Sequence, residues 1–135
     1  MDHKIDFSEN RNVFMPNEKM KKSLLQAIKK TFEYPDYKNT KVNNTIANYF
    51  DISFDNVSIT NGSMEAINLL VNVLRKNDAT LFKPTFWGYE DALMRYAYNI
   101  NSIPLDHKLK YNIDNIESQA QNSDLIFICN PNNPH

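Results

Sequence analysis

The sequence predicts an α/β fold in which helices cover a mostly parallel sheet. Segments with apolar residues at helical spacing alternate along the chain with short β-branched or apolar runs, an order typical of parallel α/β domains. Residues 124–129 begin with an aspartate and continue as an apolar run, the pattern of a strand buried on both faces of a parallel sheet. Hydrophobic residues make up 41% of the 135 residues, which is enough for a core. At this length the chain is one domain at most, or a piece of one.

Composition excludes several classes of function. The formal net charge is −1, with 15 Lys+Arg against 16 Asp+Glu, and the charges are interspersed, so no basic surface for nucleic acid is expected. No apolar run approaches the length of a membrane span. The single cysteine, Cys129, excludes an internal disulfide and suits a reducing compartment. The histidines have no metal-ligand spacing. We therefore expect a soluble, cytoplasmic protein that binds no metal, nucleic acid or membrane.

The first fifty residues predict two helices. After a polar, irregular start, a helix opens at Pro16 and runs to Phe32, with lysines opposite its apolar residues. Pro35 ends this helix, because proline disfavours the helical conformation in the residue before it. A second helix is expected at residues 40–50, and a loop at residues 51–56 leads to the first strand.

A strand, a glycine turn and a helix follow. A β-branched run at residues 57–60 predicts the strand, Asn61-Gly62 breaks it, and Ser63 takes the N-cap position of a helix that ends near Lys76. This arrangement suits a phosphate, because the first N–H groups of a helix and its dipole favour an anion. The alternative is a plain helix cap without phosphate. The apolar helix face expected in the core comprises Ile67, Leu70, Val71 and Leu74.

The rest of the chain continues the alternation. Strands are expected at residues 79–82, 98–103 and 124–129, and helices at residues 86–97 and 115–121. The last strand delivers a turn rich in asparagine and proline to the edge of the sheet where α/β folds place ligands.

Three motifs carry a family resemblance. They are N-G-S-M-E-A-I at residues 61–67, P-T-F-W-G-Y at residues 84–89 and N-P-N-N-P at residues 130–134. In this order they resemble the first part of the fold-type I pyridoxal-phosphate enzymes, and most nearly the histidinol-phosphate aminotransferases and threonine-phosphate decarboxylases. The segments Y-P-D at residues 34–36 and D-F-S-E-N at residues 6–10 match the same branch. The resemblance covers essentially the whole chain but well under half of a complete family member.

The resemblance implies a partial, truncated three-layer α/β/α large domain with a mostly parallel sheet. Residues 1–33 correspond to an N-terminal segment and helix, and residues 34–135 to the first part of the domain that binds pyridoxal 5'-phosphate. In the family, later strands lie between the strand equivalent to residues 57–60 and the strand equivalent to residues 125–129. We therefore expect a gap in the sheet, with unpaired edges and exposed apolar faces.

The resemblance also implies roles for individual residues in cofactor binding. The backbone N–H groups of Ser63, Met64 and Glu65, together with the Ser63 hydroxyl, hold the cofactor phosphate at the helix N-terminus. Phe86 stacks on the pyridine ring, for which the alternative is ordinary packing. The side-chain amide of Asn133 donates to the phenolic oxygen of the cofactor.

Two further features follow from the resemblance. The bond between Asn133 and Pro134 is a candidate for a cis peptide. Tyr34 reaches the cofactor phosphate of the neighbouring subunit, which implies a homodimer; the alternative is a buried hinge aromatic. Two other positions have simpler interpretations. We expect Gly88 to allow close helix packing and Cys129 to be an inert thiol in the core.

The sequence departs from the family pattern at its end. The family continues after Asn-Pro with Thr-Gly, whereas His135 stands in place of the threonine. The Schiff-base lysine, the aspartate beside the pyridine nitrogen, a tyrosine and the substrate-binding arginine lie further on in the family, so no catalytic residue is assigned. We therefore expect a truncated or partial gene product without activity of its own.

The leading functional interpretation is the N-terminal part of a pyridoxal-phosphate-dependent aminotransferase, acting between an amino acid and a 2-oxo acid. Two alternatives stay open: a fragment of an amino-acid-phosphate decarboxylase, and a non-catalytic remnant that binds a partner. A nucleotide-binding domain is disfavoured, because neither G-x-G-x-x-G nor a Walker lysine motif occurs in the sequence.

Overall fold

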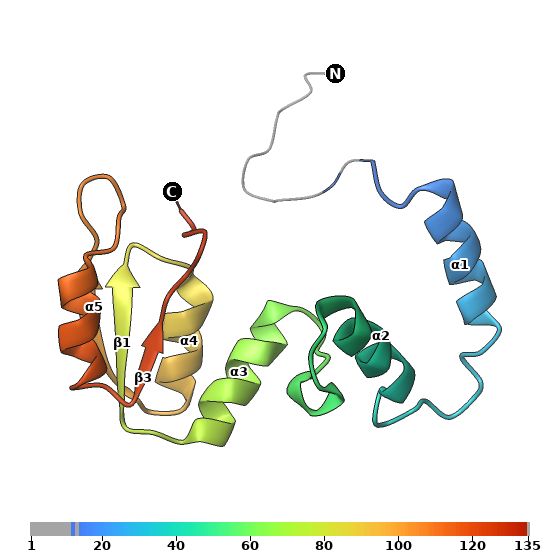
Figure 1. Ribbon diagram of the computed structural model, residues 1–135, viewed down its shortest axis with the longest axis horizontal. Helices are drawn as coiled ribbons and strands as arrows, with labels where there is room; N and C mark the ends of the chain where they lie inside the picture. The colour runs from blue at the N-terminus through green and yellow to red at the C-terminus, as the bar shows by residue number, and fades with distance from the viewer. Residues whose placement is uncertain (1–11, 13, 135) are drawn as a thin grey trace. The chain divides into compact units, whose positions relative to one another are not determined.

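The computed structural model describes residue 12 and residues 14–134 (Figure 1). The chain divides into two compact units, one ending at Val57 and the other beginning at Ser58. The D-F-S-E-N segment at residues 6–10 and His135, both of which enter the family resemblance, lie outside the described residues.

The first unit contains two helices and one 3-10 helix. Helix α1 spans Glu18–Ile28, helix α2 spans Thr40–Phe50, and the 3-10 helix η1 spans Phe54–Asn56. Helix α2 has the predicted bounds, whereas η1 lies in the segment predicted as a loop. Among the described residues of this unit, the buried ones are Asn43 and Ala47, both in α2.

Helix α1 is shorter than predicted. The Asn17 side chain caps its N-terminus by accepting a backbone N–H of the first turn at 2.9 Å. The helix ends at Ile28 rather than Phe32, because the N–H groups of Lys30 and Thr31 bond three residues back instead of four. The Thr31 hydroxyl also donates to the Ile28 carbonyl at 2.8 Å and so satisfies this end of the helix. The apolar spacing therefore continues beyond the last helical turn.

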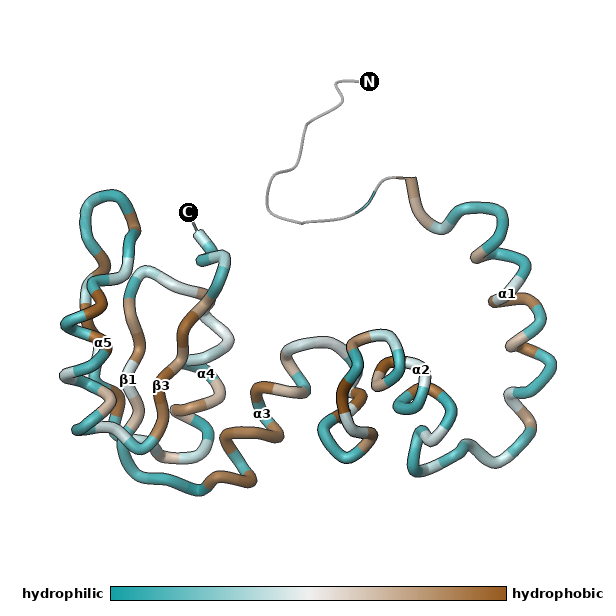
Figure 2. The backbone as a smooth tube through the Cα atoms, viewed as in Figure 1, coloured by the Kyte–Doolittle hydropathy of each residue, from teal (hydrophilic) through white to brown (hydrophobic). Residues whose placement is uncertain are grey.

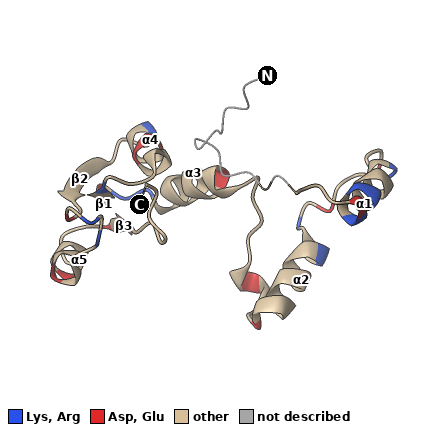
Figure 3. Ribbon diagram, turned by 90° about the horizontal axis from the view of Figure 1, so that it is seen from above, with Lys and Arg blue, Asp and Glu red and all other residues tan. Residues whose placement is uncertain are grey.

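The second unit alternates helices and strands. Its elements are α3 (Ser63–Leu74), β1 (Asp78–Lys83), α4 (Trp87–Arg95), β2 (Asn99–Pro104), α5 (Ile113–Ala120) and β3 (Leu125–Phe127). The strands form a parallel sheet in the order β2-β1-β3, with Asp78 opposite Asn99 and Ala79 opposite Leu125. Helices α4 and α5 lie on opposite sides of this sheet (Figure 3). The predicted layered α/β fold with a parallel sheet is confirmed.

The core of the second unit is formed by β1 together with α3 and α4. Val71 of α3, Leu81 of β1 and Leu93 of α4 are fully buried. Hydrophobic residues follow one another along α3 and along β3, as the brown colouring of these segments shows (Figure 2). Each fully buried side chain of this size contributes about 1.5–3 kcal/mol to folding.

The strand predicted at residues 57–60 is wrong. Val57 has extended backbone dihedrals, φ −117° and ψ 125°, but residues 57–60 pair with no strand of the described chain. A strand exists through the hydrogen bonds of a ladder, which a β-branched sequence alone does not provide. The unpaired sheet edge that the family resemblance implies is present at β3, which among the described residues pairs with β1 alone.

The last strand is shorter and more exposed than predicted. Strand β3 has three residues, Leu125–Phe127, and each is half-buried rather than buried on both faces. It pairs with β1 on one side, while its other edge faces no strand among the described residues. An edge strand is covered on fewer sides than a central one, which explains why its residues are only half-buried.

Helix α3 buries a narrower face than predicted. Ile67 and Val71 are buried in the core, as expected, but Leu70 is 54% exposed and Leu74 is 42% exposed. Ile67 and Val71 are one turn apart on a single stripe, and this stripe is the part of the helix that packs against β1 and α4. Helix α3 therefore has apolar side chains beyond those that the second unit buries.

Candidate cofactor site

The carboxyl ends of the parallel strands β1 and β3 meet at one edge of the sheet (Figure 1). Strand β1 leads into the segment P-T-F at residues 84–86, and β3 leads into the turn at residues 130–134. The Asn132 side-chain amide Nδ2 donates to the Pro84 carbonyl at 3.0 Å and so joins these two segments. Two of the three sequence motifs are thereby brought together where parallel α/β folds place ligands.

The glycine turn before α3 places the N-cap of the helix one residue earlier than predicted. Gly62 is the N-cap of α3, with φ 81° and ψ 173°, and Ser63 is the first helical residue. Gly62 takes the cap position predicted for Ser63. Its positive φ is one that residues with a side chain disfavour, which suits glycine at this position. The Ser63 hydroxyl is therefore not used to cap the helix, and the residue is exposed.

Glu65 stabilises this turn rather than serving as an acid–base group. Its carboxylate oxygen Oε2 accepts the backbone N–H of Asn61, so the side chain reaches back across the turn. An acidic residue in the first turn also suits the positive end of the helix dipole. Ser63, Met64 and Glu65 hold the first three helical positions, whose N–H groups have no acceptor within the helix.

Gly88 links the N-terminal turn of α3 to the aromatic motif. It is buried at the start of α4, and a Cβ built on it lies 2.5 Å from Phe86 Cε1 and 2.6 Å from Met64 Sδ. Both distances are shorter than any van der Waals contact, so glycine permits this approach. The expectation that Gly88 allows close helix packing is confirmed. The motif at residues 84–89 therefore lies against each of the other two motifs.

Phe86 packs against a series of aromatic rings. Its ring centroid lies 5.6 Å from that of Tyr89 in an edge-to-face arrangement at 88°, and Tyr89 stacks on Phe127 of β3 at 4.6 Å and 22°. Trp87 flanks Phe86 at 5.4 Å and is 65% exposed. Such aromatic pairs contribute about 0.5–1.5 kcal/mol beyond the area they bury. The Phe86 ring thus packs against two aromatic side chains of α4, one of which stacks in turn on β3.

The Tyr89 hydroxyl titrates far above neutral pH. Burial raises the pKa of Tyr89 to about 12, and the neighbouring Cys129 thiol adds to the shift by hydrogen bonding and by its charge. Burial also raises the pKa of Tyr111, whose hydroxyl lies beside the Cys129 backbone. Tyr89 therefore remains neutral at physiological pH, and Cys129 is half-buried beside it.

The asparagine-rich turn holds Asn133 at the surface. The peptide bond from Asn133 to Pro134 is cis, as the family resemblance implied, and so is the bond from Asn130 to Pro131. Asn133 is exposed, whereas its neighbour Asn132 is buried. Sequence reasoning missed Asn132, because nothing in N-P-N-N-P distinguishes the amide that turns inward from the one that turns outward.

Tyr34, the remaining predicted site residue, belongs to the first unit. Its side chain is 100% exposed, which excludes the alternative of a buried hinge aromatic within that unit. Its role toward a neighbouring subunit stays a prediction. In the part of the chain that the structure describes, no group of three or more His, Cys, Asp or Glu residues could hold a metal ion. Over the same residues, no helix is long and apolar enough to cross a membrane.

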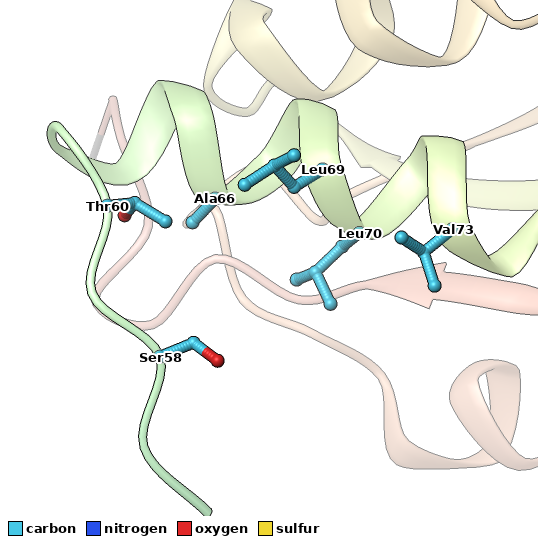
Figure 4. Close-up of a pocket in the computed structure, with 6 residues that line it drawn as sticks. All are labelled: Ser58, Thr60, Ala66, Leu69, Leu70 and Val73. Carbon is cyan, nitrogen blue, oxygen red and sulfur yellow. The ribbon is translucent and has the colours of Figure 1, made fainter. Parts of the chain in front are cut away.

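An apolar groove runs along α3 within the second unit (Figure 4). It has a volume of about 390 Å³ and is lined by Ser58, Thr60, Ala66, Leu69, Leu70 and Val73. Two hydroxyl-bearing residues come from the segment before the helix, and the other four present carbon atoms only (Figure 4). The lining of the groove is mainly apolar and contains no charged side chain.

Comparison with known proteins identifies the family. A family model described as aminotransferase class I and II matches residues 2–135. The chain belongs to this family. Among curated aminotransferases, the histidinol-phosphate aminotransferase of Hydrogenobaculum sp. (strain Y04AAS1) is 32% identical over 135 residues, covering 96% of this chain and 39% of that protein.

Solved structures of related enzymes share the fold. The histidinol-phosphate aminotransferase from Sinorhizobium meliloti in complex with pyridoxal-5'-phosphate matches with a TM-score of 0.80 at 18% identity, over 93% of this chain and 35% of that one. The L-threonine-O-3-phosphate decarboxylase from Porphyromonas gingivalis matches with a TM-score of 0.69 at 22% identity, over 84% and 33%. The chain thus spans between a third and two fifths of these relatives.

Proposed function

We propose that this chain is the N-terminal part of a pyridoxal-phosphate-dependent aminotransferase of the histidinol-phosphate type. Such an enzyme transfers an amino group between a small-molecule amino acid and a 2-oxo acid. The observation that carries the proposal is the meeting of three motifs near one sheet edge, where Asn132 bonds to Pro84 and Gly88 lies close to both Phe86 and Met64. The 32% identity to a histidinol-phosphate aminotransferase supports it.

The start of α3 fits a phosphate group. The N–H groups of Ser63, Met64 and Glu65 have helical positions without intrahelical acceptors, and the exposed Ser63 hydroxyl adds a fourth donor. A Cβ built on Gly62 meets nothing within 4 Å, so the space beside the turn is open. In the proposed site, these groups bind the phosphate of pyridoxal 5'-phosphate.

Phe86 and Asn133 complete the proposed site. The Phe86 ring, supported by Tyr89, covers one face of the pyridine ring, and the exposed Asn133 amide donates to the phenolic oxygen. When bound, pyridoxal phosphate supplies an electron sink for charge at the α-carbon of an amino acid. The part of this chain is to bind and orient the ring and to shield one face of it from water; no proton transfer is assigned to it.

Two further points belong to the same proposal. The fully exposed Tyr34 reaches the cofactor phosphate of a second subunit, so the enzyme works as a homodimer. Residues 1–33 form an N-terminal segment, and residues 34–135 form the first part of the cofactor-binding domain. The homodimer can be tested by the oligomeric state of the protein from its own cells, and the role of Tyr34 by Tyr34→Phe.

Ligand binding to the 135-residue chain tests the proposed site. Pyridoxamine 5'-phosphate is the suitable probe for calorimetric titration, because its amine forms no adduct with lysines. We expect Ser63→Ala to weaken binding about tenfold, since one hydrogen bond to a charged group is lost. Ser118→Ala, an exposed serine on α5, is the matched control and should leave affinity unchanged. Absence of binding by the unaltered chain at about 1 mM ligand would contradict the proposal.

The protein isolated from its own cells decides between the candidate activities. Its intact mass, compared with the 15.8 kDa of this chain, shows whether the product continues beyond these residues. Assays with pyridoxal 5'-phosphate, a phosphorylated amino acid and a 2-oxo acid as amino-group acceptor then separate the reactions. Conversion of the phosphorylated amino acid to its 2-oxo acid, with amination of the acceptor, supports the aminotransferase. Release of carbon dioxide without amination of the acceptor supports the decarboxylase.

A further inference from the structure

Asn132 is a buried amide in an otherwise exposed turn. It is 7% exposed, whereas Pro131, Asn133 and Pro134 are exposed. Burying an amide is unfavourable unless its polar atoms form hydrogen bonds, so its partners account for this placement. Those partners lie in three segments that are far apart in the sequence.

Both N–H groups of the Asn132 amide are used. Nδ2 donates to the Pro84 carbonyl at 3.0 Å and to the Pro134 carbonyl at 2.7 Å. The first bond connects the segment after β1 to the turn after β3, and the second holds that turn to itself. Proline has no backbone N–H, so the prolines at residues 84, 131 and 134 leave both segments short of backbone donors. The Asn132 side chain supplies the donors that are missing.

Tyr111 holds the other side of the same turn. Its hydroxyl accepts the Cys129 backbone N–H at 3.0 Å and lies 3.0 Å from the Cys129 carbonyl, to which it donates. The same hydroxyl lies 3.5 Å from Asn132 Oδ1. The Tyr111 ring packs edge-to-face on Phe82 of β1 at 5.5 Å. Tyr111 therefore links the end of β3 to the central strand.

These bonds lie between two groups of the proposed cofactor site. Pro84 is two residues from Phe86, and Asn132 is adjacent to Asn133. We propose that Asn132, supported by Tyr111, is a positioning residue that sets the separation of Phe86 and Asn133, and thereby the fit of a pyridine ring between them. This inference rests on the proposed function, but it assigns a role to a residue that contacts neither phosphate nor ring.

Asn132→Asp is the most informative substitution. It keeps the size and the Oδ1 atom, but it removes both N–H donors and places a carboxylate against the carbonyls of Pro84 and Pro134. We expect the affinity for pyridoxamine 5'-phosphate to fall about ten- to hundredfold. The affinity for inorganic phosphate should stay within about twofold, because α3 binds phosphate without the turn. A residue with a merely structural role would lower both affinities together.

A spectroscopic signal separates positioning from stability. A hydrogen bond from Asn133 to the phenolic oxygen alters the absorbance of the bound ring, so the unaltered chain should show a shift on binding that Asn132→Asp loses. Tyr111→Phe keeps the ring on Phe82, introduces no charge, and should lose part of this shift. Asn101→Ala is the matched control, because the Asn101 amide donates to Gln119 Oε1 at 2.7 Å and so joins elements away from the site.

Amide resonances of the ligand-free chain provide an independent test. Asn132→Asp, or Tyr111→Phe if the first variant does not fold, should shift the backbone resonances of Phe86 and Asn133 together, and Asn101→Ala should shift neither. Unchanged resonances at both residues would overturn the inference whether or not ligand binds. If the unaltered chain binds no pyridoxamine 5'-phosphate, the proposed function fails. If it binds and Asn132→Asp binds equally with the same absorbance shift, the positioning role alone fails.

Discussion

The two units of the chain contain similar helices in different surroundings. Helices α1 and α3 have 11 and 12 residues, and both have apolar residues at helical spacing. No residue of α1 is buried, whereas α3 buries Ile67 and Val71 in a core with β1 and α4. The same kind of pattern thus forms a helix in both units but finds packing partners in one. We infer that the second unit depends mainly on its core, and the first mainly on local hydrogen bonds and caps.

Truncating equivalent leucines should give the largest contrast. Leu93 is fully buried in α4, and Leu93→Ala should lower the free energy of unfolding by about 2–5 kcal/mol through lost burial and the cavity left behind. Leu24 in α1 is 53% exposed, and Leu24→Ala should change the free energy of unfolding by less than about 0.5 kcal/mol. Urea unfolding followed by circular dichroism measures both. Equal losses would mean that α1 has a packing partner after all.

A methyl group added at the glycine between α3 and α4 should have the next largest effect. In Gly88→Ala the new Cβ would lie 2.5 Å from Phe86 and 2.6 Å from Met64, so the ring and the thioether have to move. We expect a loss of about 1–3 kcal/mol in urea unfolding, together with weaker binding of pyridoxamine 5'-phosphate. Ser118→Ala on exposed α5 is the control. Unaltered stability and binding would show that the two helix ends separate freely.

Removing one helix cap from each unit sharpens the comparison further. Asn112 caps α5 by accepting the N–H groups of Asp114 at 2.9 Å and Asn115 at 3.4 Å, and Asn17 caps α1 with one bond at 2.9 Å. Asn112→Ala should cost about 1 kcal/mol of the stability of the second unit. Asn17→Ala should mainly speed hydrogen exchange of the α1 amides, about fivefold, because α1 has no buried side chain to hold it. Unchanged, slow hydrogen exchange of the α1 amides in Asn17→Ala would contradict the inference that α1 depends on its cap.

The last expected effect is a loss of stability at alkaline pH. The pKa of Tyr89 is raised from 10.0 to about 12 in the folded chain, so its neutral form is favoured by folding. The corresponding stabilisation is fully present below pH 10, falls as the pH rises, and is lost once the pH has passed about 12. Urea unfolding at a series of pH values should show this decline, and Tyr89→Phe should reduce it. Tyr34→Phe, at a fully exposed position, should leave it unchanged.

Local patterns predicted much of the fold. The sequence of α2 predicted the bounds that the structure has, and the apolar run at residues 79–82 predicted β1 to within one residue at each end. Residues 57–60 were mistaken for a strand because a β-branched run does not reveal whether a partner strand exists. Leu70 and Leu74 were mistaken for core residues because helical spacing gives the direction of a face, not the width that becomes buried.

The candidate site was predicted through its motifs rather than through its contacts. The order of the motifs correctly indicated one edge of the sheet, since parallel strands end there. The cap was misplaced by one residue, because the positive φ of Gly62 cannot be read from its neighbours. The Asn132 and Tyr111 contacts could not be predicted, because they depend on which side chains turn inward once β1 and β3 have paired.

The order of the strands also favours one order of assembly of the second unit. Strand β1 meets β2 across 21 residues, between Asp78 and Asn99, but the start of β3 only across 46, between Asp78 and Asp124. Closing the longer loop loses more chain entropy before any contact compensates for it. We therefore expect β1, α4 and β2 to fold first and β3 to join them later. The Phe86 ring would then be in place before the turn that carries Asn133, so the proposed site would close only in the last step of folding.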